Sequence, residues 1–305
     1  MPSSASPTPA APPSAVPPPV THYENFPVAS WLCPPRLRAP IRAIYHFART
    51  ADDLADEGPA SPEQRLGVLS QFKSELHQYL DTPAPTQSVT EPQPEWARMF
   101  TALAQVHQQW QLPLNLLDDL LDAFCQDVSW TAQQRCYANE AELLDYCRRS
   151  ANPVGRLLLH LDGVQDPLSL RQSDAICSAL QLINFWQDLG QDLARGRHYI
   201  PDAALQAAQL SRADLLQQAQ QGQASPALRR LIQAQVGTAV KLMQEGAPLA
   251  GRLPGRFGWE LRAVVQGGLQ IVRHIQARQF DTLAHRPKLG KADAWAILWR
   301  TIWPQ

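Results

Sequence analysis

The sequence predicts an all-α fold, a bundle of helices that begins near residue 36. Apolar residues recur at helical spacing along the chain, and no sustained period-two alternation indicates a β-sheet. Three expected helix starts carry a capping residue followed by proline, at Ser61-Pro62, Asn152-Pro153 and Ser225-Pro226. No shift in composition divides residues 25–290, so we expect residues 21–305 to form a single all-helical domain.

The helices expected from this periodicity span residues 36–57, 61–80, 95–109, 113–128, 139–150, 153–162, 168–194, 225–249, 257–282 and 290–302. Residues 1–20 hold eight of the 27 prolines and neither Lys nor Arg, which predicts a disordered tail and not a targeting sequence. Residues 82–94 contain four prolines and are expected to form an exposed linker. Residues 195–201 combine glycine, proline and an aromatic side chain, and are expected to form an ordered loop.

Composition excludes several classes of protein. The formal net charge of −1 gives no electrostatic footprint for nucleic acid. The five cysteines form no CxxC pair, which predicts free thiols in a reducing compartment and therefore a cytoplasmic protein. No apolar run approaches the roughly 18 residues that span a bilayer. Trp295, Trp299 and Trp303 give the last helix an aromatic face, so this helix either closes the core or makes a peripheral contact with a membrane.

Two pairs of aspartates spaced four residues apart, distant from each other in the sequence, are the main candidates for a functional site. Residues four apart project from the same face of a helix. In the first pair, Asp52 and Asp56 share a face about 60° wide with Tyr45 and Arg49. The rest of this helix is largely apolar, so the polar stripe is either a solvated acidic face or one wall of a site.

The second pair, Asp188 and Asp192, shares a face about 80° wide with Gln181 and Asn184. The remainder of that helix is apolar nearly all round, which is typical of a buried helix. Buried carboxylates need a partner or a metal ion. The stripe is therefore predicted to line a cavity.

The spacing within each pair suits a divalent cation. Two carboxylates four residues apart destabilise a helix by roughly 0.2–0.5 kcal/mol, and a cation between them removes that penalty. Mg²⁺ takes a few carboxylates together with phosphate oxygens of a substrate. Two facing pairs would therefore hold a diphosphate through bridging Mg²⁺ ions. Arg197 and Tyr199, which follow Asp192, would bind oxygens of the same diphosphate.

The literal DDxxD motif at residues 118–122 is a weaker candidate. Five apolar residues around it form an ordinary amphipathic face, namely Leu116, Leu117, Leu120, Leu121 and Phe124. Asp118 and Asp122 are then expected on the opposite, solvated side of the helix.

Over residues 22–293 the chain resembles the squalene/phytoene synthase family of isoprenoid synthases. The segments that carry the resemblance are Tyr45-x-x-x-Arg49-x-x-Asp52-Asp-x-x-Asp56, Tyr146-Cys147 with Val154-Gly155, Gln181-x-x-Asn184 with Asp188-x-x-x-Asp192, and Arg197-x-Tyr199-Ile-Pro201. Segments 24–28, 146–155, 265–268 and 286–293 are similar, more narrowly, to the branch of this family that serves bacterial hopanoid synthesis. Gln187 departs from the pattern, because many members have arginine immediately before the second pair.

The resemblance implies an isoprenoid synthase bundle with a central apolar pocket and the two aspartate pairs at its mouth. The residues implied in catalysis are Asp52, Asp56, Asp188 and Asp192, as Mg²⁺ ligands, and Tyr146. The residues implied in binding diphosphate and shaping the pocket are Tyr45, Arg49, Gln181, Asn184, Arg197 and Tyr199. With Gln187 in place of arginine, the site would make one cationic contact fewer to diphosphate.

The narrower likeness implies that presqualene diphosphate and water become hydroxysqualene and diphosphate, with Mg²⁺ and without NADPH. The implied partners are a prenyl diphosphate substrate, other enzymes of the hopanoid route and a membrane surface, and no nucleic acid. Two alternatives stay open. A head-to-head prenyl transferase of the same fold would make presqualene diphosphate, squalene, dehydrosqualene or phytoene. A non-catalytic scaffold would have lost metal ligands, whereas all four are intact in this chain.

Overall fold

The computed structural model describes residues 33–81 and 96–302, and all regular secondary structure within these ranges is helical. The helices are α1 (Pro35–Asp56), α2 (Pro62–Asp81), α3 (Ala97–Trp110), α4 (Leu114–Ala132), α5 (Glu140–Ser150), α6 (Asn152–Asp162), α7 (Pro167–Ala194), α8 (Asp202–Ala207), α9 (Arg212–Gln221), α10 (Pro226–Gly246), α11 (Leu249–Arg252), α12 (Gly255–Ala277) and α13 (Lys291–Ile302). The all-α prediction is confirmed. The expected tail at residues 1–20 and the expected linker at residues 82–94 lie outside the described residues.

The helix starts show which capping predictions were right. The Ser61 hydroxyl accepts a hydrogen bond from the N–H of Gln64, and the Ser225 hydroxyl accepts one from the N–H of Leu228. Asn152 is not a cap, because it is already the first residue of α6 and its amide oxygen accepts from the Ser178 hydroxyl at 2.9 Å. The side chain expected to cap α6 instead joins α6 to α7.

Three short helices between residues 202 and 252 were not expected. Helix α9 has a capping box, in which the side chains of Ser211 and Asp214 each accept from the other residue's backbone N–H. Only Leu215 is fully buried in α9, so the helix lacks the apolar stripe from which helices are recognised in sequence. Helix α12 also ends at Ala277, earlier than the expected residue 282, and an irregular segment follows it.

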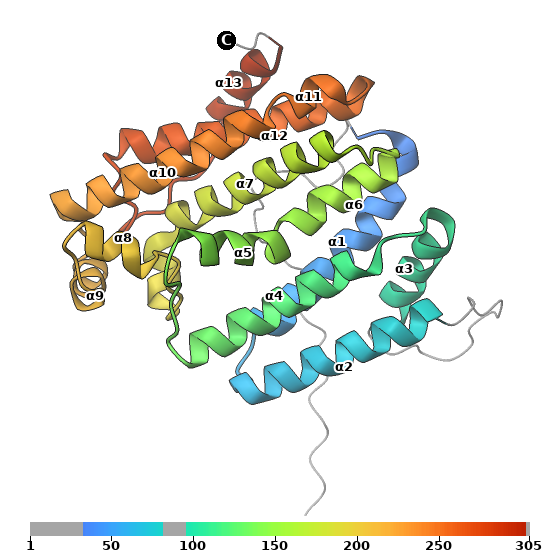
Figure 1. Cartoon of the computed structure of the whole chain (residues 1–305), viewed down its shortest axis with the longest axis horizontal. Coiled ribbons are helices and arrows are strands. Elements are labelled where there is room, and N and C mark those ends of the chain that lie inside the picture. The colour runs from blue at the N-terminus through green and yellow to red at the C-terminus, as the bar shows by residue number, and fades with distance from the viewer. Residues whose placement is uncertain (1–32, 82–95, 303–305) are drawn as a thin grey trace, which may run out of the picture.

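Helix α7 runs through the middle of the bundle, with α10 and α12 on one side and α5 and α6 on the other (Figure 1). Its apolar residues are buried around most of its circumference, including Leu182, Ile183, Phe185 and Trp186. The sequence prediction of a buried central helix is therefore confirmed. Helices α1, α2, α3 and α4 form the other half of the molecule around a second apolar cluster that contains Phe47, Phe72 and Phe100.

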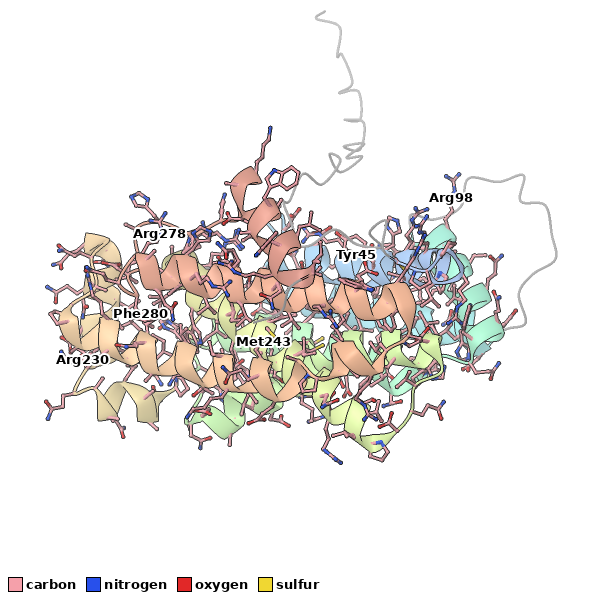
Figure 2. The ribbon with its side chains drawn as sticks, turned by 90° about the horizontal axis from the view of Figure 1, so that it is seen from above. Tyr45, Arg98, Arg230, Met243, Arg278 and Phe280 are labelled. Carbon is pink, nitrogen blue, oxygen red and sulfur yellow. The ribbon has the colours of Figure 1, made fainter. Side chains whose placement is uncertain are left out.

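Helices α7, α10 and α12 approach closely where α12 carries glycine. A Cβ atom on Gly268 would lie 2.7 Å from Leu180 Cδ2 of α7 and 3.0 Å from Met243 Cε of α10. Met243 is fully buried in the last turn of α10 and is labelled in Figure 2. The close approach leaves no room for a larger residue at position 268 without movement of its neighbours.

The segment between α12 and α13, residues 278–290, crosses α7, and its contacts there include three with Trp186, Gln187 and Gly190. The Thr282 hydroxyl donates to the Trp186 carbonyl at 2.7 Å, and the Gln187 side-chain amide donates to the Pro287 carbonyl at 2.6 Å. A Cβ atom on Gly190 would overlap the carbonyl group of Leu283. Gly190 therefore allows the backbone of this segment to lie directly on α7.

Helix α13 lies beyond α12 at the edge of the bundle (Figure 1). It is anchored by Asp293, whose Oδ1 accepts from the Gln270 amide at 2.7 Å and lies 2.9 Å from His274 Nε2. Trp295 and Trp299 are 76% and 65% exposed, so these two residues do not close the core. Trp303 lies outside the described residues. Within the described ranges, no helix combines the length and apolar character required to cross a bilayer.

Replacing Gly190 with alanine should lower the free energy of unfolding by about 1–3 kcal/mol, because the added methyl group forces the 278–290 segment away from α7. Urea denaturation would measure this change. Gly237 in α10 is the matched control, since a Cβ atom there meets nothing within 4 Å and alanine should be neutral or stabilising. Equal loss of stability in the two variants would contradict the packing role of Gly190.

Candidate active site

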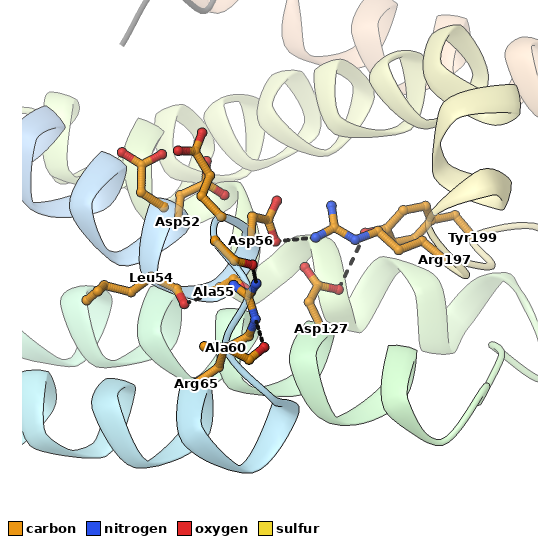
Figure 3. Close-up of polar contacts among 12 residues, drawn as sticks. Asp52, Leu54, Ala55, Asp56, Ala60, Arg65, Asp127, Arg197 and Tyr199 are labelled. Atoms are coloured by element: carbon orange, nitrogen blue, oxygen red, sulfur yellow. Dashed lines mark hydrogen bonds and ion pairs between the residues drawn. The ribbon is translucent and has the colours of Figure 1, made fainter. Parts of the chain in front are cut away.

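The stripe predicted on α1 lies on one face of that helix and is tied to a distant part of the chain. Arg49 Nη1 lies 3.0 Å from Asp52 Oδ2, and Arg49 Nη2 lies 2.6 Å from Asp53 Oδ1. Asp56, one turn later, forms an ion pair with Arg197, which follows α7 (Figure 3). Tyr45 is half-buried two turns before Asp52 on the same helix. The first aspartate pair is therefore joined to the loop after the second pair.

The stripe on α7 keeps solvent-accessible surface inside an otherwise buried helix. Gln181, Asn184 and Asp188 are half-buried, whereas the apolar residues between them are buried. Asp192, at the end of the stripe, is 9% exposed. The stripe is therefore less buried than the apolar faces of α7, and the cavity that it was expected to line stays a prediction.

The two aspartate pairs share one electrostatic environment. Burial and the neighbouring Asp56 raise the pKa of Asp52 to about 6, while Arg49 and Arg197 oppose that rise. Burial and the neighbouring Asp188 raise the pKa of Asp192 to about 7, while Arg197 again opposes it. Arg197 thus acts on carboxylates of both pairs. Carboxylates placed this closely are unfavourable together and favour a cation.

Arg286, which the sequence analysis did not assign to the site, pairs with the second aspartate pair. Both its Nε and Nη2 donate to Asp188, and the Nη2–Oδ2 distance is 3.1 Å. Arg286 belongs to the segment that Gln187 holds through the Pro287 carbonyl. The Gln187 side chain is fully buried, and its hydrogen bond holds this segment against α7. Arg286 thus brings a guanidinium to Asp188, while the expectation of one cationic contact fewer to diphosphate stays a prediction.

Asp127 of α4 is a second residue of this region that sequence reasoning missed. Its Oδ2 accepts a hydrogen bond from the Tyr146 hydroxyl. Its Oδ1 accepts one from the Tyr199 hydroxyl at 3.4 Å (Figure 3). Burial raises the pKa of Asp127 to about 7, against the opposing effects of Tyr146 and Arg197. Its signal in the sequence was a carboxylate on the apolar face of α4, seven residues after Leu120.

Aromatic rings surround Asp127. The Tyr199 ring stacks on Phe185 of α7, with centroids 3.7 Å apart and planes inclined by 12°. The Tyr146 ring lies 6.1 Å from Tyr199 and 6.2 Å from Phe185. Burial, followed by the charge of Asp127, raises the pKa of both phenols well above the usual value. Tyr146 and Tyr199 therefore stay protonated at neutral pH and act as hydrogen-bond donors.

The literal DDxxD motif lies apart from this cluster, on the side of α4 that faces α2. Asp122 is paired with Lys73 at 2.8 Å, and Asp118 Oδ1 lies 2.9 Å from His77 Nε2. Asp122 is exposed as expected, whereas Asp118 is only partly exposed because α2 covers it. These contacts assign the motif a role in the packing of α2 on α4.

The donor set fits Mg²⁺ together with a phosphate ligand. Within residues 33–81 and 96–302, no group of three or more His, Cys, Asp or Glu side chains is placed to hold a metal ion alone. Each aspartate pair therefore offers two carboxylates and leaves other positions to ligand oxygens and water, as is common for Mg²⁺. Arg197 and Arg286 neutralise one carboxylate of each pair in the structure.

Known proteins resemble this chain over most of its length. The family model for squalene/phytoene synthase matches residues 20–293. The hydroxysqualene synthase of Rhodopseudomonas palustris is 36% identical over 268 residues, which cover 87% of this chain and 83% of that protein. The hydroxysqualene synthase of Zymomonas mobilis is 36% identical over 272 residues, which cover 88% of this chain and 84% of that protein. The crystal structure of squalene synthase HpnC from Alicyclobacillus acidocaldarius covers 86% of this chain and 91% of its own, with 32% identity and a TM-score of 0.72. A dehydrosqualene synthase structure with 18% identity, which covers 88% of this chain and 86% of its own, shares the fold at a TM-score of 0.72. The chain has the isoprenoid synthase fold and belongs to the squalene/phytoene synthase family.

Proposed function

We propose that this chain converts presqualene diphosphate and water to hydroxysqualene and diphosphate, with Mg²⁺ and without a reductant. The observation that carries the proposal is the presence of two intact aspartate pairs, one bound by Arg197 and the other by Arg286, in a chain 35–36% identical to proteins named hydroxysqualene synthase. The non-catalytic alternative loses support, because family members that had lost catalysis would not need to keep this arrangement.

The residues have separate tasks in this proposal. Asp52, Asp56, Asp188 and Asp192 would hold Mg²⁺, which supplies Lewis-acid stabilisation of the departing diphosphate when bound. Arg49, Arg197 and Arg286 would bind diphosphate oxygens through charge-assisted hydrogen bonds. The rings of Phe185, Tyr146 and Tyr199 would face the carbocation left behind, since aromatic faces attract cations. Gln181, Asn184 and Tyr45 would complete the walls.

A head-to-head prenyl transferase is the second candidate. It is favoured by the solved relative from Alicyclobacillus acidocaldarius, which is named a squalene synthase. The aspartate pairs would assist departure of diphosphate in either reaction. The two activities are therefore distinguished by which substrate the protein converts.

Purified protein should convert presqualene diphosphate to hydroxysqualene when Mg²⁺ is present and NADPH is absent. The product should carry oxygen from ¹⁸O-labelled water, and chelation of the metal should stop the reaction. Mass spectrometry of the products gives both results. Efficient formation of presqualene diphosphate from farnesyl diphosphate alone would instead support the condensing activity.

Replacing Asp52 or Asp188 with asparagine should reduce turnover by at least ~10³-fold, because stabilisation of charge by the metal is worth several kcal/mol. Asp122→Asn is the matched control on the exposed side of α4, and its turnover should stay within about threefold of wild type. Steady-state release of diphosphate measures all three variants. A crippled Asp122 variant beside active Asp52 and Asp188 variants would overturn the assignment.

Contact with a membrane is proposed to be peripheral and to use α13. Its exposed apolar residues are Trp295, Leu298, Trp299 and Ile302, and the substrate and product proposed above are long hydrocarbons that partition into lipid. Trp295→Ala combined with Trp299→Ala should reduce binding to lipid vesicles while turnover in detergent stays unchanged. Cosedimentation with vesicles would measure the binding, and unchanged cosedimentation would remove α13 from the contact.

A further inference from the structure

Asp127 connects the candidate active site to solvent. On its inner side, both carboxylate oxygens accept hydrogen bonds from phenols, Oδ2 from Tyr146 and Oδ1 from Tyr199. These phenols belong to the ring cluster with Phe185, whose helix also carries the second aspartate pair. No hydrogen bond or ion pair within the described residues joins Asp127 to Asp52, Asp56, Asp188 or Asp192, although Asp127 feels the charges of Asp52 and Asp56. Because both of its carboxylate oxygens are taken up by phenols, Asp127 is assigned a role other than holding metal.

On its outer side, Asp127 lines a small pocket. The pocket has a cavity volume of about 10 Å³ and is also lined by Tyr199, His198 and Arg135. This volume accommodates about one water molecule. The Nδ1 atom of His198 is buried and has no hydrogen-bond partner in the described part of the chain, so a water molecule in the pocket would have a polar partner waiting. Arg135 is 52% exposed, which places the outer wall of the pocket at the protein surface.

The proposed reaction produces a proton that must leave the site. When water attacks a carbocation, its oxygen forms the new C–O bond and the resulting oxonium must lose one proton. The leaving diphosphate is one acceptor, but it is held by cations and is then a weak base. The phenols cannot act alone, because burial raises their pKa well above the usual value and disfavours the phenolate.

We propose that Asp127 receives this proton through the phenol of Tyr146, an inference that rests on the proposed function. Water gives one proton to the Tyr146 oxygen as the C–O bond forms, and the Tyr146 hydroxyl proton moves to Oδ2 of Asp127. The positive charge of the carbocation and the negative charge of the carboxylate cancel in this step. Asp127 then releases its proton to water in the outer pocket.

The environment of Asp127 suits a proton acceptor that is reset at neutral pH. Burial raises its pKa to about 7, close to the value at which a group both accepts and releases protons efficiently. Tyr146 is the better bridge of the two phenols, because the Tyr199 hydroxyl lies 3.4 Å from Oδ1 of Asp127, beyond the usual length of an O–H···O hydrogen bond. Tyr146 is therefore the catalytic residue that contacts the reacting water, and Asp127 acts through it.

The test separates diphosphate departure from capture by water. Asp127→Asn keeps the shape of residue 127 and one acceptor oxygen for a phenol, but it cannot accept a proton. With presqualene diphosphate, Mg²⁺ and ¹⁸O-labelled water, this variant should still release diphosphate within about tenfold of wild type. The yield of labelled hydroxysqualene per diphosphate released should fall at least ~10-fold, since loss of a general base slows its step by 10²–10⁴-fold and elimination then competes.

Three further variants complete the design. Tyr146→Phe should show the same fall in yield, and combining it with Asp127→Asn should lower the yield no further, because the two residues act as a unit. Asp118→Asn, on the α2 side of the same helix, should keep the wild-type yield. Circular dichroism and melting curves confirm that each variant is folded.

Three outcomes would overturn the inference. The yield per diphosphate released could stay unchanged in Asp127→Asn and Tyr146→Phe. Diphosphate release could fall in Asp127→Asn as far as in Asp52→Asn, which would make residue 127 part of diphosphate binding. An absence of hydroxysqualene from the wild-type reaction would contradict the proposed function, and the inference with it.

Discussion

Carboxylates from two helices that come close inside a bundle have to be neutralised, and much of this structure follows from that requirement. Arg197 pairs with Asp56 and Arg286 pairs with Asp188, so each aspartate pair receives a guanidinium from another part of the chain. Removing one partner of a buried ion pair is strongly destabilising, since it leaves an uncompensated charge. The loop after α7 and the segment before α13 are therefore held in place by the same charges that would bind metal and diphosphate.

The buried central helix carries that arrangement. Helix α7 packs around most of its circumference, which fixes the direction in which Asn184 and Asp188 project. It also forms the surface on which residues 278–290 lie, through Gln187 and the small residue Gly190. A site assembled on a packed helix and tied by short contacts is rigid, and rigidity is what positions catalytic groups.

The sequence predicted those features that depend on local spacing. The fold class, the long helices and the stripes on α1 and α7 follow from residues three to four apart, and the structure contains them. Arg286 was missed because its partner is distant in sequence and no local pattern shows it. Asp127 left one local signal, a carboxylate on the apolar face of α4, but its phenol partners are also distant in sequence. The role of Gln187 was missed for a related reason. A glutamine at this position suggested one cationic contact to diphosphate fewer. In the structure its side chain holds the Pro287 carbonyl, next to Arg286, which pairs with Asp188.

The segment that crosses α7 also leads directly into α13. Arg286 is bound to Asp188, Pro287 is bound to Gln187, and Asp293 anchors the first turn of α13 to α12. Trp295 and Trp299 follow on that same turn and the next, exposed to the surroundings. Because few residues separate these contacts, the distance between the exposed indole rings of Trp295 and Trp299 and the carboxylates of the second aspartate pair is held nearly constant. Any surface that contacts α13 would therefore have a defined position and orientation relative to the second aspartate pair.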